Sequence, residues 1–443
     1  MHTRASLRLL TLFILFVCLP ITGAEQKAQI NKSRYHDQLM GFWLGQSIAN
    51  WTGLVTEMDK IGGAGIHGKF YRREDWGRTD LPSIWGQGIP SDLSPTIDWV
   101  LRVDQEPWGS DDDTDIEYMY QYLMAQHETT RLSAKQIHDG WMTHIYSDDN
   151  TPFKSADGKP ENYLWVSNQQ AHDLMRNESM LPPETGRQAN NPHYDMIDAQ
   201  LSTEIFGLFA PYNYELALAI ADLPIRTVAD KEAVAAAQFY VILHSLAVGI
   251  DPAKDVKAQL QIIALQAREH LPNNSYLAHM FDEIYTAYQA QKPWEDVRDA
   301  VYQTYQVEGK HGYDISSRDL YCNGCFASGI NFAASLISYF YGEGDYKQTV
   351  KLAVLMGWDS DNPAATWGGL LGFIYGYEVI QGLFEENLSI QFNIHRTRGG
   401  FPDNGRDNFK QMATMGVAVT ERVIVEEMGG ELEDGTWLFP IQR

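Results

Sequence analysis

Cysteine is scarce in this chain: only Cys18, Cys322 and Cys325 occur among its 443 residues. So few thiols exclude a disulfide-dense scaffold and a four-cysteine zinc site. Cys322 and Cys325 are three residues apart, a spacing that suits either a small disulfide or a pair of buried thiols. A zinc ion would need two further soft ligands, and none is arranged nearby.

Basic residues are also few. The chain has 34 Lys and Arg against 58 Asp and Glu, a formal net charge of −24. Such a charge repels nucleic-acid phosphates and anionic membrane surfaces. Nucleic acid is therefore not expected as a partner.

Long apolar runs are missing except at the N-terminus. Arg4 and Arg8 precede an apolar stretch at 9–19, and small residues follow at 22–24. This layout predicts a signal peptide over 1–24, a mature protein of 25–443 and a secreted or periplasmic location. No later stretch approaches about 20 apolar residues, so no membrane anchor is expected.

The mature part shows no linker or low-complexity break, and we interpret it as a single domain over 25–443. Alternating strand patterns are scarce before the last 50 residues, which predicts an all-α orthogonal multi-helix bundle. Regions 61–109 and 147–191 are rich in turn residues and predict long loops, of which 61–109 is an insertion. Residues 388–443 predict a small mixed C-terminal extension with a helix near 417–428 and a short β-hairpin. Helices are predicted at 35–51, 116–125, 215–221, 231–248, 253–269, 275–289, 326–341, 346–356 and 363–380.

Two short acidic runs lie far apart in the chain, and each leads into a predicted helix. They contain Asp111, Asp112 and Asp113 in the first run and Asp359 and Asp361 in the second. Adjacent carboxylates in a partly buried site repel each other by several kcal/mol at an effective dielectric of about 20. A folded chain holds them together if they stay solvated, share protons or coordinate cations. Hard oxygen ligands favour Mg²⁺, Mn²⁺ or Ca²⁺.

The second run is followed by Asn362 and Pro363, which predict a helix N-cap and first helical position. Gly368, Gly372 and Gly376 then recur every four residues and predict a smooth strip on which another helix can pack closely. In the first run, Asp115 is expected to be an ordinary first-turn acid that points outward.

A third segment, 41–57, has small residues at Gly41, Gly45 and Ala49 that predict a close-packing helix face. Gly53 is placed to end this helix and deliver Glu57 to a loop.

Together the three segments resemble the ADP-ribosylglycohydrolase family, which includes the dinitrogenase reductase-activating glycohydrolases. The family pattern G-x-x-x-G-x-x-x-G-D-x-x-G-x-x-x-E is matched at Gly41, Gly45, Gly53 and Glu57, with Ala49 and Asn50 departing from it. The T-D-D-T run is matched at Asp112-Asp113-Thr114, with Asp111 in place of threonine. The G-G-D-T-D-T-x-A-A-x-x-G-x-x-x-G run is matched at Gly357, Asp359, Asp361, Ala364, Ala365, Gly368 and Gly372, with Trp358, Ser360 and Asn362 departing.

The resemblance implies a site for two divalent cations, Mg²⁺ first, with Mn²⁺ and Ca²⁺ as alternatives. The implied ligands of one ion are Asp111, Asp112, Asp113 and Asp361. The implied ligands of the other are Asp359, Asp361 and Asn362, with Asp361 bridging.

The resemblance also implies the reaction, which is hydrolysis of an N- or O-glycosidic bond at C1 of ADP-ribose or a related ribofuranoside. Asp113 is the first candidate for activating water and Glu57 the second. The implied partners are a small-molecule or glycan furanoside, including the ADP-ribose of a modified protein.

The family's Asn-Gly-Ser/Ala-Met-Arg-like segment corresponds to 198–204 here, where that pattern is not kept. Tryptophans in the 61–109 insertion can stack on a sugar or pin the loop to the core. Two other functions therefore stay open: a secreted glycosidase for a furanoside or glycan unrelated to ADP-ribose, and a non-catalytic metal- or ligand-binding protein.

Overall fold

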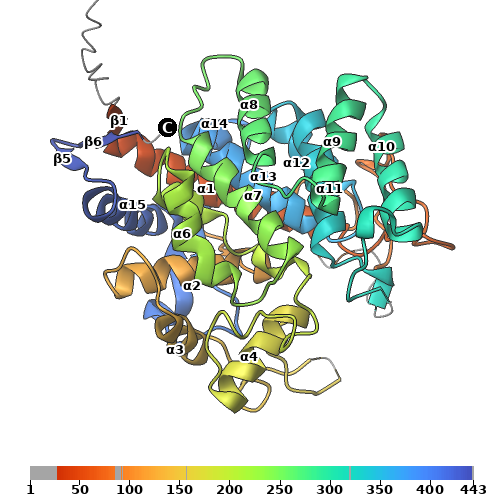
Figure 1. The fold of residues 1–443 in the computed structure, drawn as a ribbon, viewed down its shortest axis with the longest axis horizontal. Helices are drawn as coiled ribbons and strands as arrows, with labels where there is room; N and C mark the ends of the chain where they lie inside the picture. The colour runs from red at the N-terminus through yellow and green to blue at the C-terminus, as the bar shows by residue number, and fades with distance from the viewer. Residues whose placement is uncertain (1–26, 85–90, 92, 156, 319–320, 442–443) are drawn as a thin grey trace, which may run out of the picture.

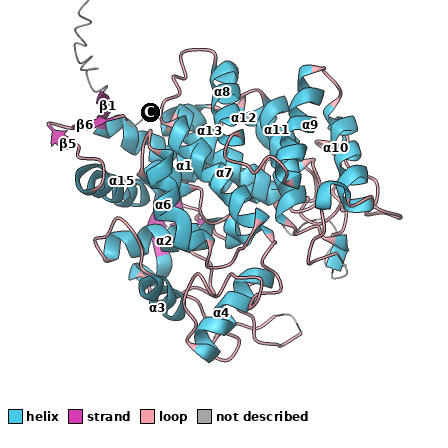
Figure 2. Ribbon diagram, viewed as in Figure 1, coloured by secondary structure: helices cyan, strands magenta, loops and turns pink. Residues whose placement is uncertain are grey.

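The computed structural model describes residues 27–84, 91, 93–155, 157–318 and 321–441. The signal peptide predicted over 1–24 lies outside these residues. Helices make up most of the described chain, and its strands are short (Figures 1 and 2). This confirms the predicted all-α fold.

The helices run along the chain as follows: α1 (Lys32–Gly53), α2 (Asp112–Gln126), α3 (Ala134–His144), α4 (Val166–Glu178), α5 (Ile205–Phe209), α6 (Tyr214–Ile225), α7 (Glu232–Ala247), α8 (Val256–Arg268), α9 (Tyr276–Gln289), α10 (Trp294–Val301), α11 (Ser328–Gly342), α12 (Tyr346–Val354), α13 (Asp361–Tyr375), α14 (Tyr377–Gly382) and α15 (Phe409–Glu426). The strands are β1 (Lys27–Asn31), β2 (Trp108–Gly109), β3 (Gln391–Asn393), β4 (Arg406–Asn408), β5 (Glu431–Glu433) and β6 (Thr436–Pro440).

The strands form two small sheets of three strands each, in the orders β1-β6-β5 and β2-β3-β4. β5 and β6 are the predicted hairpin, and β1 pairs antiparallel with β6 so that Ala28 lies opposite Phe439. In the other sheet β2 runs parallel to β3, with Trp108 opposite Phe392. The C-terminal extension is therefore joined to both the first described strand and the end of the long insertion.

The centre of the fold is the crossing of α1 and α13, which overlap in the middle of Figure 1. A Cβ added at Gly41 would lie 2.3 Å from the carbonyl oxygen of Gly372, and one at Gly45 would lie 2.3 Å from that of Gly368. The helices thus touch backbone to backbone, which only glycine permits. Every residue of α13 except Tyr375 is buried.

The predicted helix 363–380 is in fact two helices, because Gly376 has a φ of +84°. Its predicted start is also wrong. α13 begins at Asp361, so Asn362 lies in the first turn instead of capping it.

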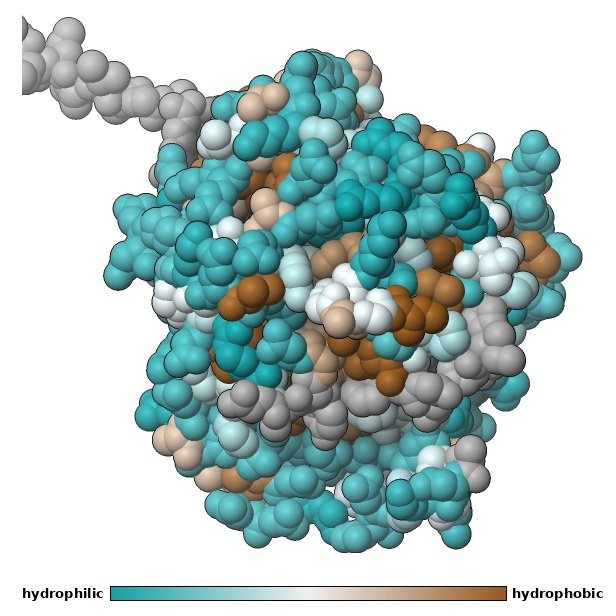
Figure 3. All heavy atoms as spheres, turned by 90° about the vertical axis from the view of Figure 1, so that its right-hand side faces the viewer, coloured by the Kyte–Doolittle hydropathy of each residue, from teal (hydrophilic) through white to brown (hydrophobic). Residues whose placement is uncertain are grey.

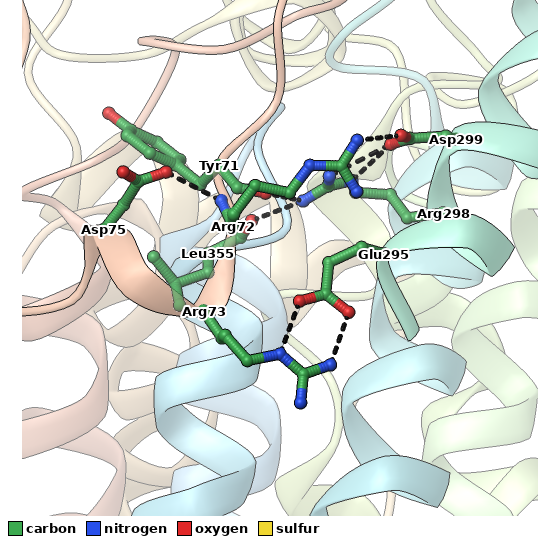
Figure 4. Close-up of polar contacts among 8 residues, drawn as sticks. All are labelled: Tyr71, Arg72, Arg73, Asp75, Glu295, Arg298, Asp299 and Leu355. Atoms are coloured by element: carbon green, nitrogen blue, oxygen red, sulfur yellow. Dashed lines mark hydrogen bonds and ion pairs between the residues drawn. The ribbon is translucent and has the colours of Figure 1, made fainter. Parts of the chain in front are cut away.

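Segment 61–109 has no helix longer than the 3-10 turn Arg73–Asp75 among its described residues. Figure 4 shows the polar contacts that hold this segment against α10. The buried side chain of Arg298 donates hydrogen bonds to the carbonyl oxygens of Tyr71 (2.7 Å) and Leu355 (3.0 Å), and Arg73 forms two hydrogen bonds to Glu295 (2.8 and 2.7 Å). An extended segment is thereby held against the helices by one buried and one partly exposed arginine.

The tryptophans of this segment also pack on the core. Trp76 and Trp99 lie edge to face at 5.4 Å, and Trp99 stacks on Tyr346. Trp108 is fully buried and donates to the carbonyl oxygen of Ser389. Trp85 lies outside the described residues. The described tryptophans therefore pin the loop, which was one of the two roles considered for them.

Cys322 and Cys325 form a disulfide. The face at the right of Figure 1, shown in Figure 3, is largely hydrophilic with a smaller group of apolar residues. None of the helices in the described ranges combines the length and apolar character needed to cross a membrane.

Candidate metal centre

Three segments meet at the C-terminal end of α1. The turn after α1 carries Glu57, α2 begins at Asp112, and α13 begins at Asp361. At Gly53 an added Cβ would lie 2.3 Å from the Cα of Asp361. The glycine that ends α1 therefore makes room for an aspartate more than 300 residues away.

The convergence produces two groups of three carboxylates that share one member. Oxygens of Glu57, Asp359 and Asp361 all lie within 4.8 Å of one another, and the same holds for Asp111, Asp113 and Asp361. The two acidic runs and Glu57 are thus brought together, and Asp361 stands between the two groups. A pair of oxygen cages with a common carboxylate is an arrangement that two hard divalent cations can occupy.

Asp112 and Asn362 are the two implied ligands that stand outside these groups. Asp112 belongs to neither group of three carboxylates. The Nδ2 of Asn362 donates to Oδ1 of Asp113 (3.0 Å), and its Oδ1 accepts from Nε2 of Gln200 (3.2 Å). Asn362 thus orients Asp113 through a hydrogen bond. Ion binding by Asp112 or by Asn362 itself stays a prediction.

The carboxyl groups are buried together, and this controls their protonation. Burial raises the pKa of Asp111, Asp113 and Asp359 well above the usual aspartate range, and the negative charge of Asp361 is the next largest cause. The same two causes raise the pKa of Glu57. The pKa of Asp112 rises to about 8 for the same reasons. Bound cations would reverse this effect, because they favour the ionised carboxylates.

The residues present fit such cations. Oδ1 of Asp361 is buried and has no hydrogen-bond partner among the described residues, so the shared carboxylate keeps a free lone pair at the centre. An unpaired buried carboxylate oxygen is costly unless a cation or a proton satisfies it. The donor atoms are all oxygens, as Mg²⁺, Mn²⁺ and Ca²⁺ prefer.

A second layer of polar groups holds the ligands in place. Asn50, on α1, donates to Oδ2 of Asp111 at 3.0 Å. Ser360 donates to the carbonyl oxygen of Gly53 at 3.1 Å and contacts the hydroxyl of Thr56 at 2.9 Å, which ties the turn before α13 to the end of α1. Sequence reasoning noted Asn50 and Ser360 only as departures from the family pattern, and the structure gives each a supporting contact.

Asp115 does lie in the first turn of α2, but the expectation that it points outward is wrong. Asp115 is 1% exposed, and its Oδ2 forms an ion pair with Nε of Arg398 at 2.8 Å, whose side chain is also buried. Because α2 begins at Asp112 and not near Asp115, the residue falls on the inward side of the first turn. Burial raises its pKa to about 6, and Arg398 works against that shift. No local pattern could have paired residues so far apart in the chain.

The fold and this centre define a mostly helical protein with an acidic site suited to a pair of hard cations. The family model for ADP-ribosylglycohydrolase matches residues 31–391. The chain belongs to the ADP-ribosylglycohydrolase family, as its three sequence motifs predicted.

Among solved structures, the chain is similar to an "ADP-ribosylglycohydrolase-related protein complex" with a TM-score of 0.49 and 15% identity, covering 88% of this chain and 99% of that one. No curated protein matches the chain. Family membership supports a glycohydrolase for ADP-ribose-type substrates, in a family that generally depends on divalent metals. Residues 392–443, with β4 to β6 and α15, lie beyond the family match.

Proposed function

We propose that this protein is a metal-dependent hydrolase that cleaves the N- or O-glycosidic bond at C1 of ADP-ribose or a related ribofuranoside. The observation that carries the proposal is the pair of carboxylate groups sharing Asp361, within a chain of the ADP-ribosylglycohydrolase family. Under this proposal Asp111, Asp113 and Asp361 hold one ion, and Glu57, Asp359 and Asp361 hold the other. Mg²⁺ is the first choice of ion.

Two bound cations would supply a grip on the vicinal hydroxyls of the furanose and would acidify a water molecule. The chain's own part is to position and remove a proton. Asp113 is the proposed base, because the hydrogen bond from Asn362 fixes the orientation of its carboxylate within the group that would hold the first ion. Water adds to C1, the bond to the leaving group breaks, and the proton taken by Asp113 passes to that group.

Glu57 is the second candidate for this proton transfer. It is less buried than Asp113 and sits on the turn after α1, not on a helix. A residue on a turn can move with the substrate more easily than one in the first turn of a helix. Glu57 therefore has a proposed double role, as an ion ligand and as an acid or base.

A substrate panel tests the proposal. ADP-ribosyl-arginine, ADP-ribosyl-serine, O-linked ADP-ribose conjugates and aryl ribofuranosides would be assayed with Mg²⁺ and with EDTA. We expect hydrolysis of at least one ADP-ribosyl substrate with Mg²⁺ and its loss with EDTA. Hydrolysis of aryl furanosides or glycans alone would favour a glycosidase unrelated to ADP-ribose, and ion binding without any turnover would favour a binding protein.

We also propose that the protein is exported after removal of residues 1–24. The support is the charged, apolar and small-residue order of that segment. N-terminal sequencing of the protein recovered from its producing cells would test this. A mature chain starting near Glu25 outside the cytoplasm is expected, and an intact N-terminus in the cytoplasm would refute it.

A further inference from the structure

A pocket of about 710 Å³ lies where the C-terminal extension meets the end of β2 and the loop that follows α3. Its walls include Ser110, Tyr146, Phe153, Arg396, Arg398 and Arg406. We call it the arginine pocket. Its volume falls in the range of ligand sites, roughly 300–1,000 Å³.

The charge of this pocket is opposite to that of the protein. The whole chain has a net charge of −24, yet the described residues that line the pocket include three arginines and not a single Asp or Glu. A concave site lined by one sign of charge concentrates ligands of the other sign. In so acidic a chain, this local reversal favours an anionic ligand.

The three arginines do not have the same role. Arg398 is buried and fully engaged: it pairs with Asp115 and donates to the carbonyl oxygens of Asn162 (2.7 Å) and Tyr163 (3.0 Å). Its charge is neutralised, so it builds the wall of the pocket and does not hold a ligand.

Arg396 and Arg406 are the available cations. The side chain of Arg396 is 50% exposed, donates to the hydroxyl of Tyr163 at 2.6 Å and forms an ion pair with Glu161 at 3.6 Å. Unlike the buried pair of Arg398, this ion pair is long and half exposed, and such pairs are weak. Arg406 is exposed, and within the described ranges its guanidinium donates from Nε to the carbonyl oxygen of Asp403 (3.3 Å). Each guanidinium has five N–H donors, so both keep several for a ligand.

The pocket also offers aromatic surface. The guanidinium of Arg396 lies 5.9 Å from the ring centroid of Phe153 and 4.7 Å from that of Tyr163. Stacked arginine and aromatic groups restrict the motion of the guanidinium and so prepare it to bind an oxyanion.

The arginine pocket adjoins the candidate metal centre. Ser110 lines the pocket and immediately precedes Asp111, and its backbone N–H donates to the carbonyl oxygen of Asn393 at 3.1 Å. Arg398, which also lines the pocket, is paired with Asp115 on the first turn of α2. One short stretch of chain therefore separates the ion ligands from the pocket, and most of the pocket's wall comes from beyond the family match at residue 391.

We propose that the arginine pocket binds an oxyanion, a phosphate or a carboxylate, carried by the furanoside that is cleaved at the metal centre. The substrate part of this proposal rests on the proposed function, whereas anion binding itself does not. Arg396 and Arg406 contact the oxyanion, and Arg398 positions the wall.

Binding is measured first, by calorimetry in EDTA so that no cation contributes. The probes are inorganic phosphate and ribose 5-phosphate, with ribose as the uncharged comparison. Arg396→Gln combined with Arg406→Gln should weaken binding of both phosphates at least tenfold. Arg187→Gln is the matched control, because Arg187 is 49% exposed and pairs with Glu184 at 3.2 Å on another part of the surface. Equal affinity in the double variant, or no phosphate binding by the wild type at millimolar concentration, would overturn the proposal.

Steady-state kinetics then test whether the bound anion is part of the substrate. The ratio of kcat/KM for an ADP-ribosyl substrate to that for a neutral aryl ribofuranoside should fall about tenfold in the double variant. Phosphate should inhibit the ADP-ribosyl substrate competitively, raising KM without lowering kcat. Noncompetitive inhibition would assign the pocket to a free anion and refute its substrate role. If no furanoside is hydrolysed, the proposed function fails while the calorimetry still decides whether the pocket binds anions.

Discussion

Gly53→Ala should damage the metal centre without removing any ligand. The new methyl group would lie 2.3 Å from the Cα and 2.9 Å from the backbone nitrogen of Asp361, whereas ordinary contacts lie at 3.4–4 Å. The neighbouring atoms are backbone, so no side chain can rotate away. Either the end of α1 or the start of α13 must move by about 1 Å.

A displacement of that size falls on the carboxylate that both oxygen groups share. Disturbing the supports of a metal ligand typically weakens ion binding about 10- to 100-fold, and overpacking a filled site costs about 1–3 kcal/mol of stability. We therefore expect weaker binding of both ions, together with a lower unfolding temperature.

Gly382→Ala is the matched control. Gly53 and Gly382 are both the last residue of a helix, but a Cβ at Gly382 would meet nothing within 4 Å. Its substitution should leave ion binding at the wild-type level. Calorimetric titration with Mn²⁺ and thermal unfolding with and without EDTA would compare the three proteins. Wild-type affinity and stoichiometry in Gly53→Ala would refute the packing argument.

Asp361→Ala should lose both ions, whereas Glu57→Ala should lose only the ion that Glu57, Asp359 and Asp361 would hold and should hydrolyse more slowly. Elemental analysis of each variant checks this, and a wild-type metal content in Asp361→Ala would contradict the sharing of that carboxylate. Arg298→Met should lower stability by about 2–4 kcal/mol, because two buried carbonyl oxygens lose their donor. Limited proteolysis should then cut segment 61–109 faster than in the control Arg187→Gln, whose side chain is 49% exposed and lies outside this segment. Equal rates would argue against the fastening. Burial lowers the pKa of His244 from 6.5 to about 4. Between these pH values the unfolded chain binds a proton at this residue and the folded chain does not. The stability that is present above pH 6.5 is therefore lost as the pH falls toward 4. This contribution is on the order of 3 kcal/mol, and the difference between the unfolding curves of wild type and His244→Phe across this pH range should show it.

Most helices of the fold could be predicted because their own residues specify them. The predicted helix at 275–289 matches α9 (Tyr276–Gln289), whose N-cap Ser275 accepts a hydrogen bond from the N–H of Ala278. Helices α3, α4, α5 and α10 were missed, and the prediction of a loop over 147–191 is wrong where α4 forms. α4 lies in a stretch rich in polar and turn residues, where its buried face comes from tertiary packing and not from a strong local pattern.

The position of the acidic centre could also be predicted, because repulsion among clustered aspartates demands a counter-charge wherever they fold. The residues that contact these side chains from distant parts of the chain could not be predicted. Arg398 against Asp115 and Gln200 against Asn362 join residues that are well over a hundred positions apart. The start of α13 was misplaced for a local reason: Asn-Pro is a good cap signal, but the helix extends back to Asp361 and brings that carboxylate into the first turn.

At Gly41, Gly45, Gly368 and Gly372 the contact between α1 and α13 is made by main-chain atoms, which have no rotamers through which to adjust. The two helices cannot slide or rotate against each other without a collision of main-chain atoms, so they fit in one register alone. The separation of the acidic turns is therefore set when the chain folds, before any ion arrives.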